Sequence, residues 1–132
     1  MKSICKIKVK GKECELEFQV KKSNLFSCSC YFHNIINILK DQGQEPTDFT
    51  FSNQEFDENE YNLYFSEFPS KNIAQYQINS QIDEVILQHL LKLDKILQSD
   101  HIKKKIYEIL EEKQSITSLI YKYSKNPVEK RN

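Results

Sequence analysis

The sequence predicts a single α+β domain, with an N-terminal β-hairpin and a small sheet covered by a cluster of α-helices. Three observations predict this class. Apolar and charged residues alternate strictly near the N-terminus, which is typical of two paired strands with one buried face. A short alternating segment at residues 48–52 predicts a third strand. Most of the remaining apolar residues recur every three or four positions, as in amphipathic helices.

The hairpin alternates apolar residues with lysines over residues 5–10 and with glutamates over residues 13–18. Gly11 and Lys12 fit a two-residue type II′ turn, because glycine adopts the backbone that the first position needs. The expected cross-strand pairs are Lys10 with Glu13, Lys8 with Glu15, Lys6 with Glu17, Val9 with Cys14, Ile7 with Leu16 and Cys5 with Phe18. An exposed charge pair adds only about 0.2–1 kcal/mol, so the buried face drives folding and the charges select the register.

Helical spacing begins near Ser23, and Gly43 marks its end. The apolar positions of this helical segment are Phe32, Ile35, Ile36 and Leu39. The third strand, Asp48 to Ser52, follows. Residues 56–68 then read as a short amphipathic helix stopped by Pro69. Residues 70–80 are polar and irregular, with three apolar anchors at Ile73, Tyr76 and Ile78.

The C-terminal part predicts three helices. A first apolar stripe consists of Ile82, Val85, Ile86, His89, Leu90, Leu93, Ile96 and Leu97. Ser99 and Asp100 interrupt it, and a second stripe covers residues 102–110. A third, shorter helix is expected at residues 115–123. We therefore expect one domain over residues 1–124 and a disordered tail over residues 125–132, where charged residues have nothing to bury them.

Composition excludes several classes of partner. Lysine plus arginine and aspartate plus glutamate number 19 each, so no net field attracts nucleic acid or an anionic membrane. No apolar run reaches the roughly 18 residues of a membrane span, and no signal peptide is visible. We expect an intracellular protein, cytoplasmic or nuclear, whose four cysteines are free thiols. The bias to Lys, Asn and Gln over Ala, Gly and Arg indicates an AT-rich genome.

The candidates for chemistry are sparse. Cys28, Cys30 and His33 resemble part of a zinc site, but a closed site needs four ligands and no second cluster follows. A Cys–His nucleophile would need a lowered thiol pKa and an orienting third group. The acidic run 55–60 lacks the spacing of a calcium loop and suits a helix N-terminus instead. We expect no catalytic residue, no metal and no cofactor, and we predict that the chain is not an enzyme.

The segment LFSCSCYF, residues 25–32, lies between the hairpin and the main helical run. Its Leu25, Ser29, Tyr31 and Phe32 stand at the spacing of the signature of the BTB/POZ domain, which the segment resembles. Two more segments are similar to that family: Phe51 to Phe68, with its aromatic-rich helix, and Leu90 to Glu112, similar to the closing helix pair. The resemblance covers roughly residues 3–112 and implies that the four signature residues belong to the core.

The chain departs from the family pattern at several positions. Cys30 stands where the family usually has proline, and Leu93 or a neighbour stands where a small alanine is normal. Pro69-Ser70-Lys71 replaces the usual aromatic-glycine turn. Dimeric members carry an extra N-terminal helix and strand that swap between protomers, and this chain starts at its hairpin. It therefore resembles the short, elongin C-like form, and homo-oligomerisation is disfavoured without being excluded.

The resemblance implies that the protein holds other proteins together. It would be an adaptor on a cullin-type ubiquitin ligase, or an assembly subunit, bound through the middle of the domain at about residues 56–76. The expected partner-binding residues are Tyr61, Tyr64, Phe65 and Phe68. The predicted helix has aromatic residues on more than one face, so some would remain exposed as anchors. The alternative is that all four are core residues.

Two other interpretations stay open. A ubiquitin-like β-grasp domain with a helical extension also opens with a hairpin, a helix and a strand, and it predicts a long strand after residue 60. A ubiquitin-like or other small structural subunit of a larger complex would be equally non-catalytic. A subunit that binds a small molecule or nucleic acid belongs to a different functional class, and the balanced charge opposes nucleic acid.

Overall fold

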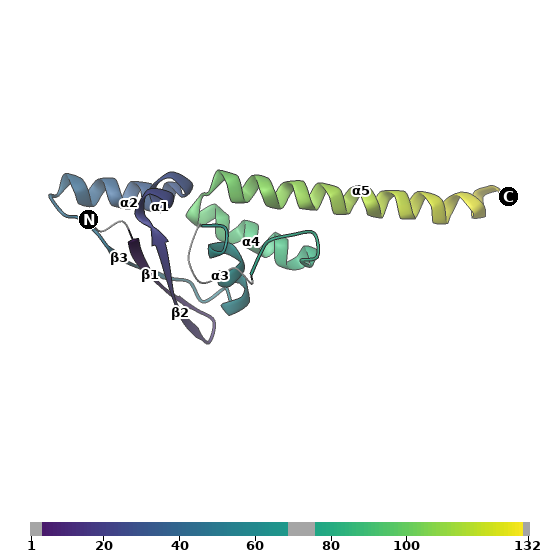
Figure 1. Ribbon diagram of the computed structural model, residues 1–132. Coiled ribbons are helices and arrows are strands. Elements are labelled where there is room, and N and C mark those ends of the chain that lie inside the picture. Colours follow the sequence, from purple (N-terminus) through teal and green to yellow (C-terminus); the bar gives the residue numbers. More distant parts are fainter. Residues whose placement is uncertain (1–3, 69–75, 131–132) are drawn as a thin grey trace.

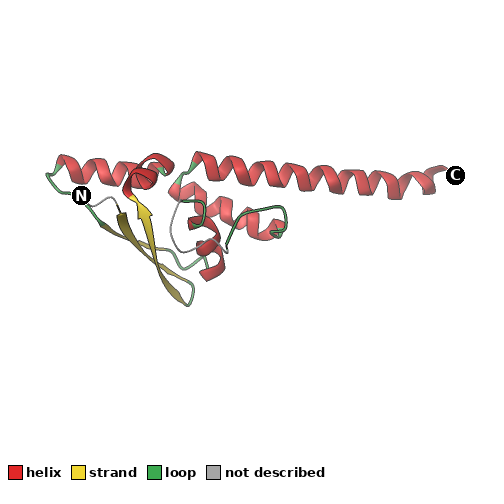
Figure 2. Cartoon of the chain, in the orientation of Figure 1, coloured by secondary structure: helices red, strands yellow, loops and turns green. Residues whose placement is uncertain are grey.

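The computed structural model describes residues 4–68 and 76–130 of the chain, and side chains up to residue 116 (Figure 1). The predicted α+β class is confirmed, with strands gathered at one end and helices over the rest (Figure 2). The elements in chain order are β1 (Ile4–Gly11), β2 (Cys14–Lys21), α1 (Lys22–Cys28), α2 (Cys30–Asp41), β3 (Asp48–Ser52), α3 (Glu58–Phe65), α4 (Glu84–Leu97) and α5 (Asp100–Lys130).

The sheet has the strand order β2-β1-β3, with β1 in the centre. Strand β1 pairs antiparallel with β2 and parallel with β3. A parallel pair needs a crossover connection, and the helices α1 and α2 form it. The predicted third strand is confirmed at its predicted bounds, Asp48–Ser52, with Phe49 and Phe51 buried.

The hairpin has the predicted faces but not the predicted register. Cys5, Ile7 and Val9 are fully buried, as alternation requires. However, Gly11 pairs with Cys14, so the turn residues are Lys12 and Glu13 instead of Gly11 and Lys12. Every predicted pair is displaced by two residues, and the observed pairs include Lys10 with Glu15, Lys8 with Glu17, Ile7 with Phe18 and Val9 with Leu16. A shift of two residues keeps each side chain on its face, so alternation alone did not distinguish these registers.

The close packing of Gly11 explains why the glycine lies inside the strand. A Cβ atom at Gly11 would come within 2.4 Å of both the Phe56 carbonyl oxygen and the Tyr61 ring. The amide of the next residue, Lys12, donates to the same Phe56 carbonyl at 2.8 Å. The glycine is therefore needed for a close approach, while Glu13 adopts the positive φ of 54° that the turn requires.

The helical run after the hairpin consists of two helices where the sequence had predicted one. Ser29 has an extended backbone, with φ −136° and ψ 118°, and separates α1 from α2. Helix α2 ends at Asp41, and Gly43 follows with a φ of 75°, in agreement with the predicted stop.

Helix α3 begins at a capping box. The Asp57 side chain accepts from the Glu60 amide, and the Glu60 side chain accepts from the Asp57 amide, both at 2.9 Å. The helix ends at Phe65, so Phe68 lies after it in the chain. Pro69 and Ile73, which the sequence analysis singled out, lie outside the described residues. Ile78 is fully buried, as its predicted role as an anchor requires.

Helices α4 and α5 meet at Ser99, where the sequence predicted the interruption. The first predicted stripe is only partly right, because Val85 and Ile96 are exposed. The separate helix expected at residues 115–123 is not observed, since α5 continues through this segment to Lys130. The domain limit at residue 124 and the disordered tail over 125–132 stay predictions.

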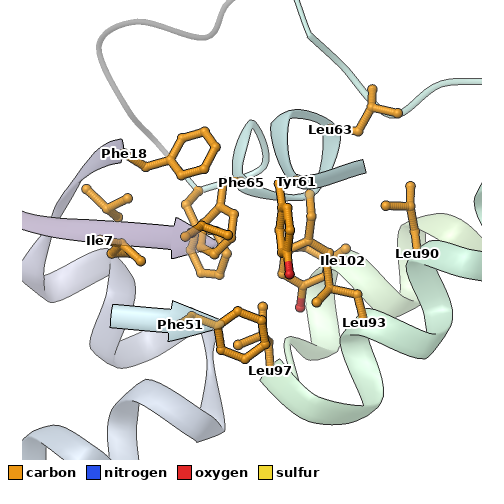
Figure 3. Close-up of a cluster of buried hydrophobic side chains, with 14 of the residues drawn as sticks. Ile7, Phe18, Phe51, Tyr61, Leu63, Phe65, Leu90, Leu93, Leu97 and Ile102 are labelled. Carbon is orange, nitrogen blue, oxygen red and sulfur yellow. The ribbon is translucent and has the colours of Figure 1, made fainter. Parts of the chain in front are cut away.

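The core is continuous from the sheet to the two C-terminal helices. Helix α3 packs against β2 and against α4, and so joins the two sides. Figure 3 shows Phe65 and Tyr61 of α3 between Ile7 and Phe18 of the hairpin on one side and Leu90, Leu93 and Ile102 on the other, with Phe51 and Leu97 drawn together below them. The rings of Phe18 and Phe65 stack with centroids 4.8 Å apart.

Candidate partner-binding surface

The four aromatic residues predicted to bind a partner are buried. Tyr61, Tyr64, Phe65 and Phe68 each have 0% of their surface exposed. The sequence was right that α3 carries aromatic residues on more than one face. It did not predict that the sheet lies on one side and α4 on the other, so that every aromatic face is covered. These residues therefore offer no surface to a partner in this arrangement.

Tyr64 takes part in a buried polar network. Its hydroxyl donates to Asp94 Oδ1 at 2.7 Å, and the Ser99 amide donates to the same oxygen at 2.9 Å. Asp94 is only 3% exposed, so these two donors replace water around its carboxyl group. Burial, followed by the nearby Asp94 carboxyl group, raises the pKa of Tyr64 well above its usual range. The network joins α3, α4 and the link that precedes α5.

The signature residues lie at the junction of α1 and α2. Leu25, Ser29 and Phe32 are buried, and Tyr31 is half-buried with its ring against Phe51. Ser29 Oγ accepts from the Phe32 amide at 3.4 Å, which caps α2, and donates to the Leu97 carbonyl at 2.5 Å. Ser29 thereby connects the N-terminus of α2 to the C-terminus of α4.

The cysteine and histidine candidates surround a surface hollow of about 530 Å³ near this junction. Cys28, Cys30, His33 and His101 contribute to its lining. The two imidazoles are engaged locally: His33 Nδ1 lies 3.1 Å from the Phe26 carbonyl, and His101 Nδ1 lies 3.3 Å from Ser99 Oγ. Within residues 4–68 and 76–116, no cluster of ligating side chains has the arrangement of a metal site.

The hairpin cysteines have a different environment. Cys5 is fully buried among core residues, and Cys14 is half-buried. Burial is the main cause that raises the pKa of both thiols. A raised pKa lowers the fraction of thiolate, the form that attacks electrophiles or binds metals. Both cysteines act as small apolar residues of the sheet.

A histidine–carboxylate cluster fastens α4 to the start of α3. His89 Nδ1 contacts Glu60 Oε2, and His89 Nε2 lies 3.3 Å from Glu55 Oε2. The imidazole also packs on the Phe56 ring, with centroids 4.6 Å apart. Glu60 already belongs to the α3 capping box, so the cluster connects this cap to the neighbouring helix.

A partly apolar, open surface follows α4 and α5. Two adjoining hollows of about 470 and 410 Å³ share Leu91, Lys95 and Tyr107 in their lining. Val85 extends this surface along α4 and is 74% exposed, and Tyr107 of α5 is 51% exposed. We call this surface the α4–α5 groove. The sequence did not predict this groove, because Val85 was expected in the buried stripe of its helix and no role was expected for Tyr107.

Comparison of the chain with protein-family models, with curated proteins and with solved structures found no match. Among the described residues, no helix combines the length and the apolar character that crossing a membrane requires.

Proposed function

We propose that this chain is a BTB/POZ-like protein-interaction domain of the short, elongin C-like form, which acts without catalysis. The observation that supports this most is the Ser29 junction. The residues that carry the resemblance, Leu25, Ser29, Tyr31 and Phe32, meet in space at one helix–helix junction, and Ser29 bonds across 68 residues of sequence to α4. The order of a hairpin, helices, a strand and further helices also supports the proposal, with α1 and α2 in place of one expected helix and α4 and α5 in place of three.

The particular role that we propose is an adaptor subunit of a cullin-type ubiquitin ligase. The resemblance implies contact through residues 56–76. Because the aromatic residues at positions 56–68 are buried, the contact belongs to the exposed polar side chains of the segment, of which Asp57, Glu58 and Asn59 at the start of α3 are described. An assembly subunit of another complex is the second candidate. The β-grasp alternative loses support, because residues 53–68 and 76–130 contain no further strand.

The test is quantitative affinity purification of the tagged chain from extract of its source cells. We expect a cullin and a RING subunit in near-stoichiometric amounts, and we expect Glu58→Lys to reduce their recovery severalfold. Glu45→Lys is the matched control, since Glu45 is also exposed but lies between α2 and β3. Alanine variants of the four aromatic residues are unsuitable, because loss of a buried aromatic side chain destabilises a fold by about 3–5 kcal/mol.

Three outcomes are distinct. The adaptor role is supported if ligase subunits are recovered with the unmodified chain and with Glu45→Lys but are reduced with Glu58→Lys. A stable set of other proteins contradicts the ligase and leaves an assembly subunit. Absence of any stoichiometric partner contradicts the interaction function itself.

A further inference from the structure

We propose that the α4–α5 groove binds an acidic, amphipathic helix of a partner protein. This inference rests on the proposed interaction function, and it adds the chemistry of a segment that the chain binds. The groove residues argued below belong to α4 and α5, whereas the ligase contact proposed above belongs to the start of α3.

The shape of the groove suits an elongated ligand. The two hollows are adjacent because they share Leu91, Lys95 and Tyr107, so together they extend along the boundary of two helices. Val85 of α4 lines only one of the two hollows, and Lys103 of α5 lines only the other. A groove between helices is a common site for a further helix, which inserts side chains spaced three and four residues apart.

The groove exposes apolar side chains that its own helices do not cover. Val85 is 74% exposed and Tyr107 is 51% exposed, although both belong to helices with buried faces. Half-buried Leu91 forms part of the floor between them. A tyrosine beside an apolar floor is a frequent anchor in protein interfaces, because it buries a large area with little loss of side-chain entropy.

The charges along the groove favour an acidic ligand. Lys95 and Lys103 are exposed, and no side chain in the described part of the chain pairs with either of them. Lys92 adds a third ammonium group, 3.5 Å from Glu55. The carboxylates of the lining are Asp94, which is buried and bonded to Tyr64, and Asp100, in the first turn of α5. The positive charge is local, since the whole chain has a net charge of zero.

A helix of a protein fits this surface better than a nucleic acid does. Lysines that alternate with apolar side chains form a mixed surface, whereas a nucleic-acid footprint is a continuous basic stripe. Acidic residues at the edges of an apolar helical stripe would meet the lysines while the stripe covers Val85, Leu91 and Tyr107.

The test is a charge swap with two designed peptides and the full chain. Each peptide has about 18 residues, enough for a helix, with leucines on one face and either glutamates or lysines beside them. Both carry a fluorescent label and are titrated with the protein by fluorescence anisotropy. We expect saturable binding of the glutamate peptide, weakened about tenfold or more by the double variant Lys95→Glu/Lys103→Glu, which in turn gains binding of the lysine peptide.

The matched control is Lys12→Glu/Lys21→Glu, which makes the same change in net charge at exposed positions of the hairpin. We expect it to leave the affinity for the glutamate peptide within twofold of the unmodified chain. Tyr107→Ser tests the apolar part and is expected to weaken the same peptide without altering the charge. Circular dichroism of each variant checks that the fold is retained.

Several results would overturn the inference. One is equal affinity of the unmodified chain for the two peptides. Another is an equal loss of affinity for the glutamate peptide in Lys95→Glu/Lys103→Glu and in Lys12→Glu/Lys21→Glu. Absence of saturable binding contradicts it as well. Displacement of the peptide by single-stranded DNA, with DNA bound more tightly, would assign the groove to nucleic acid instead. None of these results bears on the ligase subunits recovered by affinity purification, so the two proposals fail separately.

Discussion

The buried carboxyl group of Asp94 in α4 shows how a single residue can connect its helix to α3 and to the link before α5. Its partners, the Tyr64 hydroxyl and the Ser99 amide, come from α3 and from the link between α4 and α5. A buried charged or polar group that lacks a hydrogen-bond partner costs more free energy than a satisfied hydrogen bond contributes. Asp94 therefore needs both of its donors. No local pattern in the sequence indicated this network, because Tyr64 and Asp94 are 30 residues apart.

At this scale we predict that Tyr64→Phe destabilises the protein by about 1.5–3 kcal/mol, the usual contribution of a hydrogen bond to a charged group. The change removes one donor to Asp94 and keeps the ring in the core. The measurement is the free energy of unfolding by urea at neutral pH. Tyr107→Phe is the control, because Tyr107 is half exposed, and we expect a change within about 0.5 kcal/mol. Equal effects of the two variants would show that Asp94 does not depend on Tyr64.

Among the elements, the hairpin shows how packing selects between registers that alternation leaves equal. Moving the turn by one residue, which shifts the strand pairing by two, places Gly11 inside the strand against Phe56 and Tyr61, where a Cβ atom does not fit. The contact is formed by a segment 45 residues further along the chain, and the Lys12 amide bonds to it. Charge pairs between lysine and glutamate exist in both registers, so they do not choose between them.

We predict opposite effects of two substitutions at this turn. Gly11→Ala is expected to cost about 1–3 kcal/mol, because the new methyl group overpacks a site closed by backbone. Glu13→Gly is expected to be neutral or to stabilise by up to about 1 kcal/mol, since glycine adopts positive φ without the steric cost of a side chain. Urea unfolding of both variants measures these effects. A larger loss in Glu13→Gly than in Gly11→Ala would contradict the observed register.

The junction of α1 and α2 is the second element that long-range contacts define. The sequence suggested one helical run, and the structure interrupts it at Ser29 so that the serine caps α2 and reaches α4. The next amide, Cys30 N, donates to the Gln98 carbonyl at 2.9 Å and strengthens the same connection.

We predict that Ser29→Ala lowers the free energy of unfolding by about 1–3 kcal/mol, through loss of the cap and of the bond to a buried carbonyl. Ser27→Ala is the matched control, because the Ser27 hydroxyl is exposed and bonds only within α1 and to its neighbour. The measurement is thermal and urea unfolding of both variants. If the two losses were equal, the connection from α2 to α4 would not depend on Ser29.

For the whole molecule, the buried tyrosines determine how stability depends on alkaline pH. Burial is the main cause that raises the pKa of Tyr61 and Tyr64 above their usual range. The folded chain then holds these protons more tightly than the unfolded chain does. Their contribution to stability is complete below the unfolded pKa of about 10, and it is lost as pH rises further toward the folded pKa.

We therefore predict a constant urea midpoint at mildly alkaline pH and a decline above about pH 10. The decline should be smaller in Tyr64→Phe, which has one titrating group fewer. Tyrosinate absorbance, followed in the same samples, should show part of the tyrosines ionising only together with unfolding. A pH dependence identical in the two proteins would contradict this account, because the other alkaline groups are common to both.

The sequence by itself determined the α+β class, both faces of the hairpin, the third strand at Asp48–Ser52 and the interruption before Asp100. These features depend on the spacing of apolar residues and on residues that end a helix or strand. Both are properties of neighbouring residues, so they can be read from the sequence. Only the tertiary structure decided the hairpin register, the burial of the α3 aromatic residues and the α4–α5 groove. Whether an apolar side chain is core or surface depends on which distant segment packs over it. Tyr64 belongs to α3, which the sheet and α4 cover, whereas Val85 and Tyr107 lie on faces of α4 and α5 that the described segments leave largely exposed.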